Sequence, residues 1–221
     1  MRILIFIIIL AIGPFGYAQQ ISFGVTAGGN LTLPFLQSEY EIADQSFNEV
    51  HLAPLPGYEF GILSVYHFSE KFAILNTLDF AHHVYREKNG FYATNLVGET
   101  LWITEKLNRI HNYIRPGALL TLTFFDKLVL GSGIQMNILL WSRSNLGSDS
   151  PLDYTETINR YYKTISCSVP LKIAYQFSPF EISAEARMGI DNRIRGSESL
   201  IKEREGSLAI KLSYYFQKSS D

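Results

Sequence analysis

Residues 207–216 read SLAIKLSYYF and lie close to the end of this 221-residue chain. Every second residue is apolar, and those between are mostly small or polar: Leu208, Ile210, Leu212, Tyr214 and Phe216 on one face, Ser207, Ala209, Lys211, Ser213 and Tyr215 on the other. A two-residue alternation that ends in aromatic side chains is typical of a strand whose apolar face meets lipid in a transmembrane β-barrel. This segment therefore predicts a membrane barrel.

Residues 1–18 have the organisation of a secretory signal peptide. Arg2 supplies a positive charge, residues 3–12 form a short apolar run, and Gly16-Tyr17-Ala18 is compatible with signal-peptidase cleavage. We expect cleavage after Ala18, which leaves residues 19–221 as one outer-membrane β-barrel domain. A retained membrane anchor is the alternative.

Composition excludes several other classes. The formal charge is −2, and loss of Arg2 with the signal peptide would make it −3, which offers no electrostatic basis for a nucleic-acid partner. Cys167 is the single cysteine, so no intrachain disulfide can form, and we interpret it as a small buried hydrophobe. No apolar run of about 18 residues follows Ala18, so any membrane crossing must be made by strands.

Eight segments alternate in this way and predict eight strands. They span roughly 20–33, 57–68, 72–85, 110–124, 127–141, 164–177, 180–191 and 207–216. Pro116 lies within the fourth segment and predicts a bulge or local break in its pairing. The connections at 69–71, 125–127 and 178–179 are short, whereas those near 34–56, 86–109, 142–160 and 194–206 are long. Strict alternation of short and long connections predicts an antiparallel up-and-down barrel with short periplasmic turns and long outer loops.

The faces of the strands decide between lipid and a soluble core. A soluble lipocalin-type barrel is the alternative, but its narrow interior would have to hold rows of Phe, Tyr, Leu and Ile. In the membrane interpretation small and charged residues point inward, and we expect the charges to form a paired network: Glu59, Asp79, Glu181, Glu185 and Asp191 with Arg115, Lys172, Arg187, Arg193 and Lys211. An interior of eight strands is just filled by such side chains, so we expect no open pore.

Aromatic residues near the strand ends suggest interfacial belts, and ordinary strand propensity is the alternative explanation. They are Tyr58, Tyr85, Trp141, Tyr161, Tyr162, Tyr175, Tyr214 and Tyr215.

The order of these features resembles the PorT-like outer-membrane β-barrel family. The stretches that carry the resemblance are FGVTAGGNLT (23–32), PGYEFGIL (56–63), SEKFAI (69–74), VPLKIAYQF (169–177) and LAIKLSYYF (208–216). The resemblance implies an eight-stranded barrel in the outer membrane of a Gram-negative cell, with no catalytic residues to transfer, and a role for some members in protein secretion and gliding. RPGALL (115–120) and the five residues after Phe216 depart from the usual family pattern.

Four groups of residues were weighed as sites of chemistry. His82 and His83 beside Asp79 and Tyr85 resemble a metal site, but adjacent strand residues point to opposite faces. His111 with Ser166 could mimic a hydrolase pair, although their spacing supports no triad. Glu181 and Glu185 lie about 13 Å apart along one strand face, too far for a carboxylate dyad. The last group, a charged run that we interpret as a solvated loop, comprises Arg195, Lys202, Glu203, Arg204 and Glu205.

We therefore predict no catalytic, cofactor-binding or metal-binding residues and no cofactor. The favoured function is a non-enzymatic outer-membrane protein with a filled lumen, acting as a structural, surface-binding or secretion and assembly accessory protein. Its expected partners are outer-membrane lipid and a protein bound through the long loops. The alternatives are an outer-membrane lipid-modifying enzyme with a site at the outer rim and a soluble periplasmic β-barrel binding protein.

Overall fold

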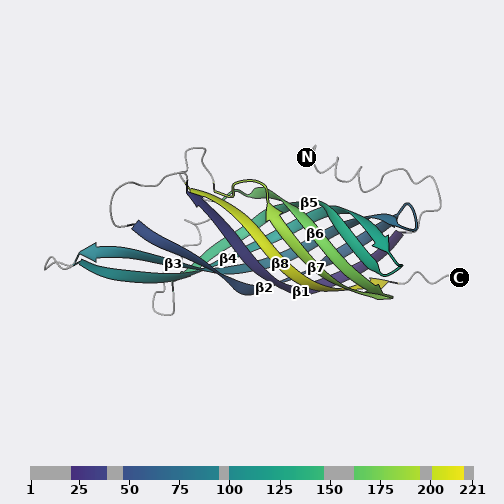
Figure 1. Cartoon of the computed structure of the whole chain (residues 1–221), viewed down its shortest axis with the longest axis horizontal. Coiled ribbons are helices and arrows are strands. Elements are labelled where there is room, and N and C mark those ends of the chain that lie inside the picture. Colours follow the sequence, from purple (N-terminus) through teal and green to yellow (C-terminus); the bar gives the residue numbers. More distant parts are fainter. Residues whose placement is uncertain (1–20, 39–46, 95–99, 147–161, 195–200, 217–221) are drawn as a thin grey trace.

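A computed structural model describes residues 21–38, 47–94, 100–146, 162–194 and 201–216. They form a closed barrel in which every strand pairs antiparallel with its neighbours in the chain and β8 closes on β1 (Figure 1). The strands are β1 Ile21–Ser38, β2 Phe47–His67, β3 Phe72–Thr94, β4 Thr100–Phe124, β5 Leu128–Leu146, β6 Ile165–Phe177, β7 Phe180–Gly189 and β8 Ile201–Phe216. The predicted eight-stranded up-and-down barrel is confirmed.

The three short connections form tight turns at the predicted positions and lie together at one end, here called the turn end (Figure 1). In the second of these turns Phe125 and Asp126 have positive φ angles of 49° and 60°, a conformation that aspartate tolerates better than most residues. β1 begins and β8 finishes at this same end (Figure 1). The predicted signal peptide, residues 1–18, lies outside the described residues.

The opposite end, here called the loop end, differs from the prediction because the strands are much longer than the alternation indicated. The β3–β4 ladder continues to the pair Thr94 and Thr100, so most of the predicted loop 86–109 is a paired hairpin. β2 begins at Phe47, β5 continues to Leu146 and β8 begins at Ile201, which shortens the other three predicted loops. Beyond the apolar belt neither strand face has to meet lipid, so pairing continues without the alternation that would reveal it.

Prolines explain where individual ladders stop. The β1–β2 ladder ends at the pair Leu31 and Pro56, while β2 continues along β3 alone. Pro54 and Pro56 lie two residues apart, so both missing N–H donors belong to the same edge of β2. At Pro116 the β4–β5 ladder is interrupted without a change of register, which confirms the predicted local break. The register shift of this ladder lies elsewhere, between Asn112 and Tyr113.

The interior is packed in layers along the barrel axis. At the turn end inward-facing apolar residues form a small core, comprising Leu63, Val65, Ala73, Leu75 and Leu119 with Tyr215 against it. Charged residues fill the middle, and a mixed layer of His, Tyr, Arg and Glu fills the loop end. Small residues of the inward face, such as Gly24, Ser166 and Gly189, are buried. Within the described residues we find no helix long and apolar enough to cross a bilayer.

The exterior is the apolar side of the barrel. Large hydrophobic side chains are exposed on every strand, among them Phe23, Phe60, Ile74, Leu120, Ile134, Leu171, Ile182 and Ile210. Cys167, predicted as a buried hydrophobe, is free and only half-buried on this face. Of the predicted belt aromatics, Tyr58, Trp141, Tyr175 and Tyr214 are exposed there. Tyr85 and Tyr162 are instead buried, and Tyr215 packs inward against the core, so the assignment of these three to the belt was wrong; Tyr161 lies outside the described residues.

Candidate functional site

An ionic network centred on Glu59 fills the middle of the barrel. Arg115 from β4 donates to the Glu59 carboxylate through Nη2, and Arg187 from β7 donates through Nη2 to Oε1 at 2.9 Å. Lys211 from β8 brings its Nζ to 3.2 Å from the same oxygen. Three cations on three strands thus share one carboxylate that is 2% exposed, and the network connects elements far apart in sequence.

The remaining charges of the middle layer complete the balance. Lys211 also lies 2.9 Å from Asp79 and 3.3 Å from Glu185. Lys172 binds Glu181 at 2.7 Å, and Tyr215 donates its hydroxyl to the same carboxylate at 3.1 Å. Because a buried ion without a partner costs several kcal/mol, this pairing is what allows so many charges inside one barrel.

Nine of the ten predicted inward charges are buried as expected. Asp191 is the exception and that prediction was wrong. It lies just beyond the end of β7, is only half-buried, and accepts a hydrogen bond from the backbone N–H of Cys167 at 2.9 Å. The strand alternation stops at Gly189, so the position of Asp191 no longer follows from it.

A second polar cluster closes the loop end of the interior, and of its charged residues only Arg193 was predicted to face inward. Arg193 pairs with Glu203 at 3.2 Å and also contacts Glu205 and the Tyr113 hydroxyl. Glu205 in turn accepts from Tyr113 at 3.1 Å and contacts Nδ1 of His83. The prediction that Glu203 and Glu205 lie in a solvated loop is wrong, because β8 begins at Ile201. Both residues are an even number of positions from Ser207 and Lys211, so the alternation of β8 could have placed them on the inward face.

The charged run divides in three. Glu203 and Glu205 face inward, and Arg204 between them is exposed. Arg195 lies outside the described residues, and only the strand position of Lys202 is described.

Aromatic rings surround Arg193 in this cluster. Its guanidinium lies 5.5 Å from the Tyr113 ring centre and 5.3 Å from that of Tyr162, distances at which cation–π attraction acts. Burial raises the pKa of Tyr162 to about 12, and the Glu203 carboxylate acts in the same direction. Burial by itself would lower the pKa of Arg193, but Glu205, Tyr113 and Glu203 together outweigh it and hold that pKa well above its ordinary value. The cluster therefore holds the neutral phenol of Tyr162 and the permanent cation of Arg193 against the carboxyl groups of Glu203 and Glu205.

The histidine pair is divided by the strand, as the sequence predicted. His82 faces outward, where its ring stacks on Tyr58 at 4.7 Å and its Nδ1 lies 2.9 Å from Asn112 Oδ1. His83 faces inward and is 2% exposed. Among the residues that the structure describes, no group of three or more His, Cys, Asp or Glu side chains is placed to hold a metal ion.

The other two candidate pairs are not brought together for chemistry. His111 pairs with Ser142 on β5 and Ser166 pairs with Asn137 on the same strand. These two β5 positions are separated by about 16 Å of strand rise. Glu181 and Glu185 each face a cation of their own, Lys172 and Arg187 respectively. Neither pair forms the arrangement of a nucleophile, base and orienting acid.

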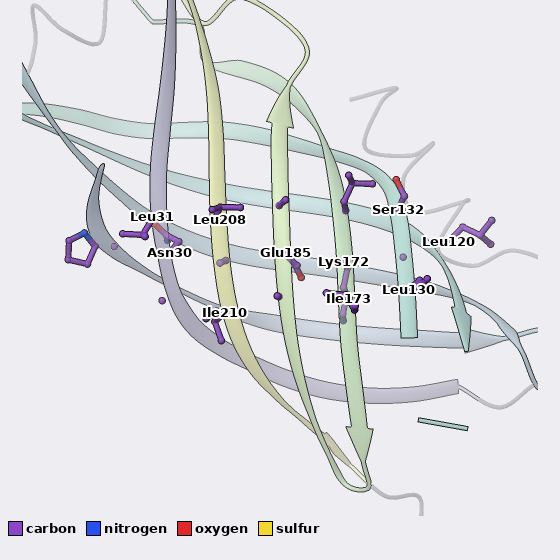
Figure 2. A pocket seen from close by; sticks show the side chains of 18 residues that line it. Asn30, Leu31, Leu120, Leu130, Ser132, Lys172, Ile173, Glu185, Leu208 and Ile210 are labelled. Atoms are coloured by element: carbon purple, nitrogen blue, oxygen red, sulfur yellow. The ribbon is translucent and has the colours of Figure 1, made fainter. Parts of the chain in front are cut away.

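Open space is scarce inside the barrel and lies mainly outside it. The inner cavity near Val65, Thr121 and Tyr215 has about 10 Å³, room for about one water. A larger depression of about 1050 Å³ is lined by residues of β1, β2 and β4 to β8 (Figure 2). Its open lining is formed by exposed apolar side chains such as Leu171, Leu208 and Ile210, whereas Lys172 and Glu185 beneath it are buried. This depression belongs to the apolar exterior and not to the polar interior.

We expect the filled interior to block ion flow. After reconstitution in a planar lipid bilayer, the protein should show no steady single-channel openings of porin size, because an eight-stranded interior is just wide enough for its own side chains. A porin inserted into the same bilayer provides the positive control. Steady, large conductance steps from the heat-modifiable, folded protein would contradict the packing described above.

The apolar exterior and the paired ionic interior define the class of protein. A closed barrel removes every unsatisfied strand edge within the bilayer, and its outward rows of Phe, Ile and Leu match hydrocarbon. A water-soluble barrel would place these rows inside. The chain is therefore an eight-stranded outer-membrane β-barrel.

Comparisons with solved structures agree on the fold. Neisserial surface protein A is 13% identical over 89% of this chain and 99% of that chain, with a TM-score of 0.51. OprG of Pseudomonas aeruginosa (12% identity, 90% and 98% coverage, TM-score 0.44) and Ail of Yersinia pestis in complex with a heparin analogue (12%, 89% and 99%, 0.42) are also similar. No protein-family profile matches the sequence, and no curated protein is significantly similar to it.

Proposed function

We propose that this protein is a non-enzymatic, non-conducting outer-membrane anchor that presents its long β3–β4 hairpin to a protein partner outside the membrane. The observation that carries the proposal is the length of that ladder. It runs on to Thr94 and Thr100, well beyond the last β5–β6 pair at Ile138 and Ile165 (Figure 1).

Two further features support this role. Among the residues that the structure describes, the interior charges are paired to one another, which favours a filled lumen over a path for a solute. The projecting part of β2 pairs only with β3, so the extension is a sheet with an open edge rather than a closed wall. Pro54 on that edge disfavours addition of another strand, which leaves recognition to the faces and tip of the hairpin. The proposal includes the predicted signal peptide, which would direct the chain across the inner membrane, and it is consistent with the resemblance to PorT-like barrels, some of which act in protein secretion.

Shortening the hairpin tests the proposal. Residues 90–104 would be replaced by a two-residue Asn-Gly turn that joins the paired positions Asn89 and Glu105. We expect the barrel to keep its heat-modifiable migration on SDS gels, because the shortened ladder lies beyond the barrel, and to lose a protein that co-purifies with the wild type from gently solubilised membranes. A matched control with Glu70→Gln and Lys71→Gln, both exposed at the turn end, should retain that protein. An identical set of co-purifying proteins for the shortened and full-length hairpins would refute the proposed role.

A further inference from the structure

The outward face of β2 to β5 carries a row of polar and aromatic residues where the apolar belt ends. Tyr58 pairs with His82, His82 with Asn112, and Asn112 with Trp141, each directly across the ladder. Tyr58 and Trp141 are 50% and 40% exposed, His82 is half-buried, and Asn112 is covered by its neighbours and 1% exposed. Amphipathic rings of this kind favour the boundary between hydrocarbon and headgroups, so this row marks the loop-end boundary of the hydrocarbon region on these strands.

Cations occupy outward positions two, four and six residues beyond this row, on β5, β3 and β4 respectively. Arg143 lies two residues beyond Trp141 on β5 and is exposed. Arg86 lies four residues beyond His82 on β3, is half-buried, and donates through Nε to Oδ1 of Asn108 at 3.0 Å. Lys106 follows two residues further from the membrane on β4 and is exposed. These three residues are called the cationic patch.

The acidic residues at the same end point the other way. Glu87 follows Tyr85 on the inward face and binds Arg109 there, with 2.8 Å between Nε and Oε2. Glu203 and Glu205 belong to the buried cluster described above. Among the described outward-facing residues of β2 to β5 beyond Tyr58, no carboxylate is present. In this part of the described wall, the carboxylates therefore lie on the inward side, where Arg109 and Arg193 pair with them, and the three cations of the patch lie on the outward side.

We propose that the cationic patch binds the phosphate groups of anionic glycolipid headgroups in the outer leaflet. Its cations lie about 7 to 20 Å along the strands beyond the aromatic row, and the tilt of the strands reduces this to a depth range that covers the headgroup region. Neighbouring strands are about 4.8 Å apart and two-residue steps rise about 6.8 Å, so the cations are spaced on the order of 10 Å, the scale of a phosphorylated sugar. Arginine guanidinium groups match phosphate geometry, and lysine adds a mobile charge. The occupant to which this surface is matched is therefore a phosphorylated lipid and not an uncharged one.

Native mass spectrometry of the detergent-purified full chain tests the proposal with two probes, diphosphorylated lipid A and the same lipid without phosphates. The test variant is Arg86→Gln/Lys106→Gln/Arg143→Gln. Its matched control is Lys71→Gln/Lys127→Gln, which removes two exposed cations from the turn end. Folding of each variant is checked by heat-modifiable migration, and the single variants Arg86→Gln and Arg143→Gln serve if the triple variant does not fold.

We expect the wild type and the control to bind diphosphorylated lipid A with similar affinity, and the triple variant to bind it at least about tenfold more weakly, with about a fivefold loss for each single variant. The phosphate-free lipid should bind the wild type as weakly as it binds the triple variant. Undiminished binding by the folded triple or single variants would overturn the proposal. Equal binding of the two lipids by the wild type would also overturn it.

Discussion

Replacing Glu59 with glutamine is expected to destabilise the barrel by about 3–5 kcal/mol, because removal of one partner leaves buried charge uncompensated. The carboxylate faces Arg115, Arg187 and Lys211, and all four side chains are at most 5% exposed. Glutamine keeps the size of the side chain and removes only its charge. Urea titration of the protein folded into lipid vesicles, followed by tryptophan fluorescence, would measure the loss in the free energy of unfolding.

A double-mutant cycle separates lost charge balance from lost packing. Lys211→Met removes the cation that Glu59 shares with Asp79 and Glu185, so the double variant Glu59→Gln/Lys211→Met restores the balance of signs. We expect the double variant to be less destabilised than the sum of the two single changes, by about 0.5–3 kcal/mol. Glu70→Gln, exposed in a turn, should change stability by less than about 0.5 kcal/mol. Strict additivity in the cycle would show that the network is not energetically coupled.

The sequence was sufficient for the membrane-embedded part of the fold because lipid imposes a pattern there. A strand with hydrocarbon on one side and a packed interior on the other must alternate, which is why β6, β7 and the second half of β8 could be located within a few residues. The turns at 69–71, 125–127 and 178–179 followed from the same breaks in pattern. The inward charges of the middle layer followed as well, since each lies in the row of small and polar residues that alternates with the apolar row.

The loop end was harder because its strands leave that environment. Beyond Arg86 on β3 and Lys106 on β4 both faces can be polar, and a paired hairpin then has the same composition as a loop. Glu203 and Glu205 were hidden for this reason, although they continue the inward phase of Lys211. The partners of Arg193 come from β4 and β8, and such contacts depend on how far each strand extends. The alternation of neighbouring residues does not show how far a strand continues beyond the membrane.

Two adjacent glycines of β1 provide the sharpest test of the inward and outward assignment. A Cβ on Gly28 would lie 2.1 Å from the carbonyl oxygen of Ile210 and 2.8 Å from Cα of Lys211, both backbone atoms of β8. A Cβ on Gly29 would have nothing nearer than a backbone oxygen at 3.8 Å. We therefore expect Gly28→Ala to force β1 away from β8 and to cost about 3 kcal/mol or more, at the upper end of the overpacking range.

Gly29→Ala is the matched control because it adds the same methyl group one residue away, on the exposed face. It should leave stability unchanged or raise it by about 0.5–1 kcal/mol, since alanine loses less conformational freedom than glycine in a strand. Both variants would be compared by urea titration in vesicles and by the fraction that reaches the heat-modifiable form. A one-residue change of register would exchange the two faces of β1, so the opposite order of stabilities would mean that β1 pairs with β8 in a different register. Equal effects would mean that the close approach of β1 to β8 at Gly28 does not exist in the folded protein.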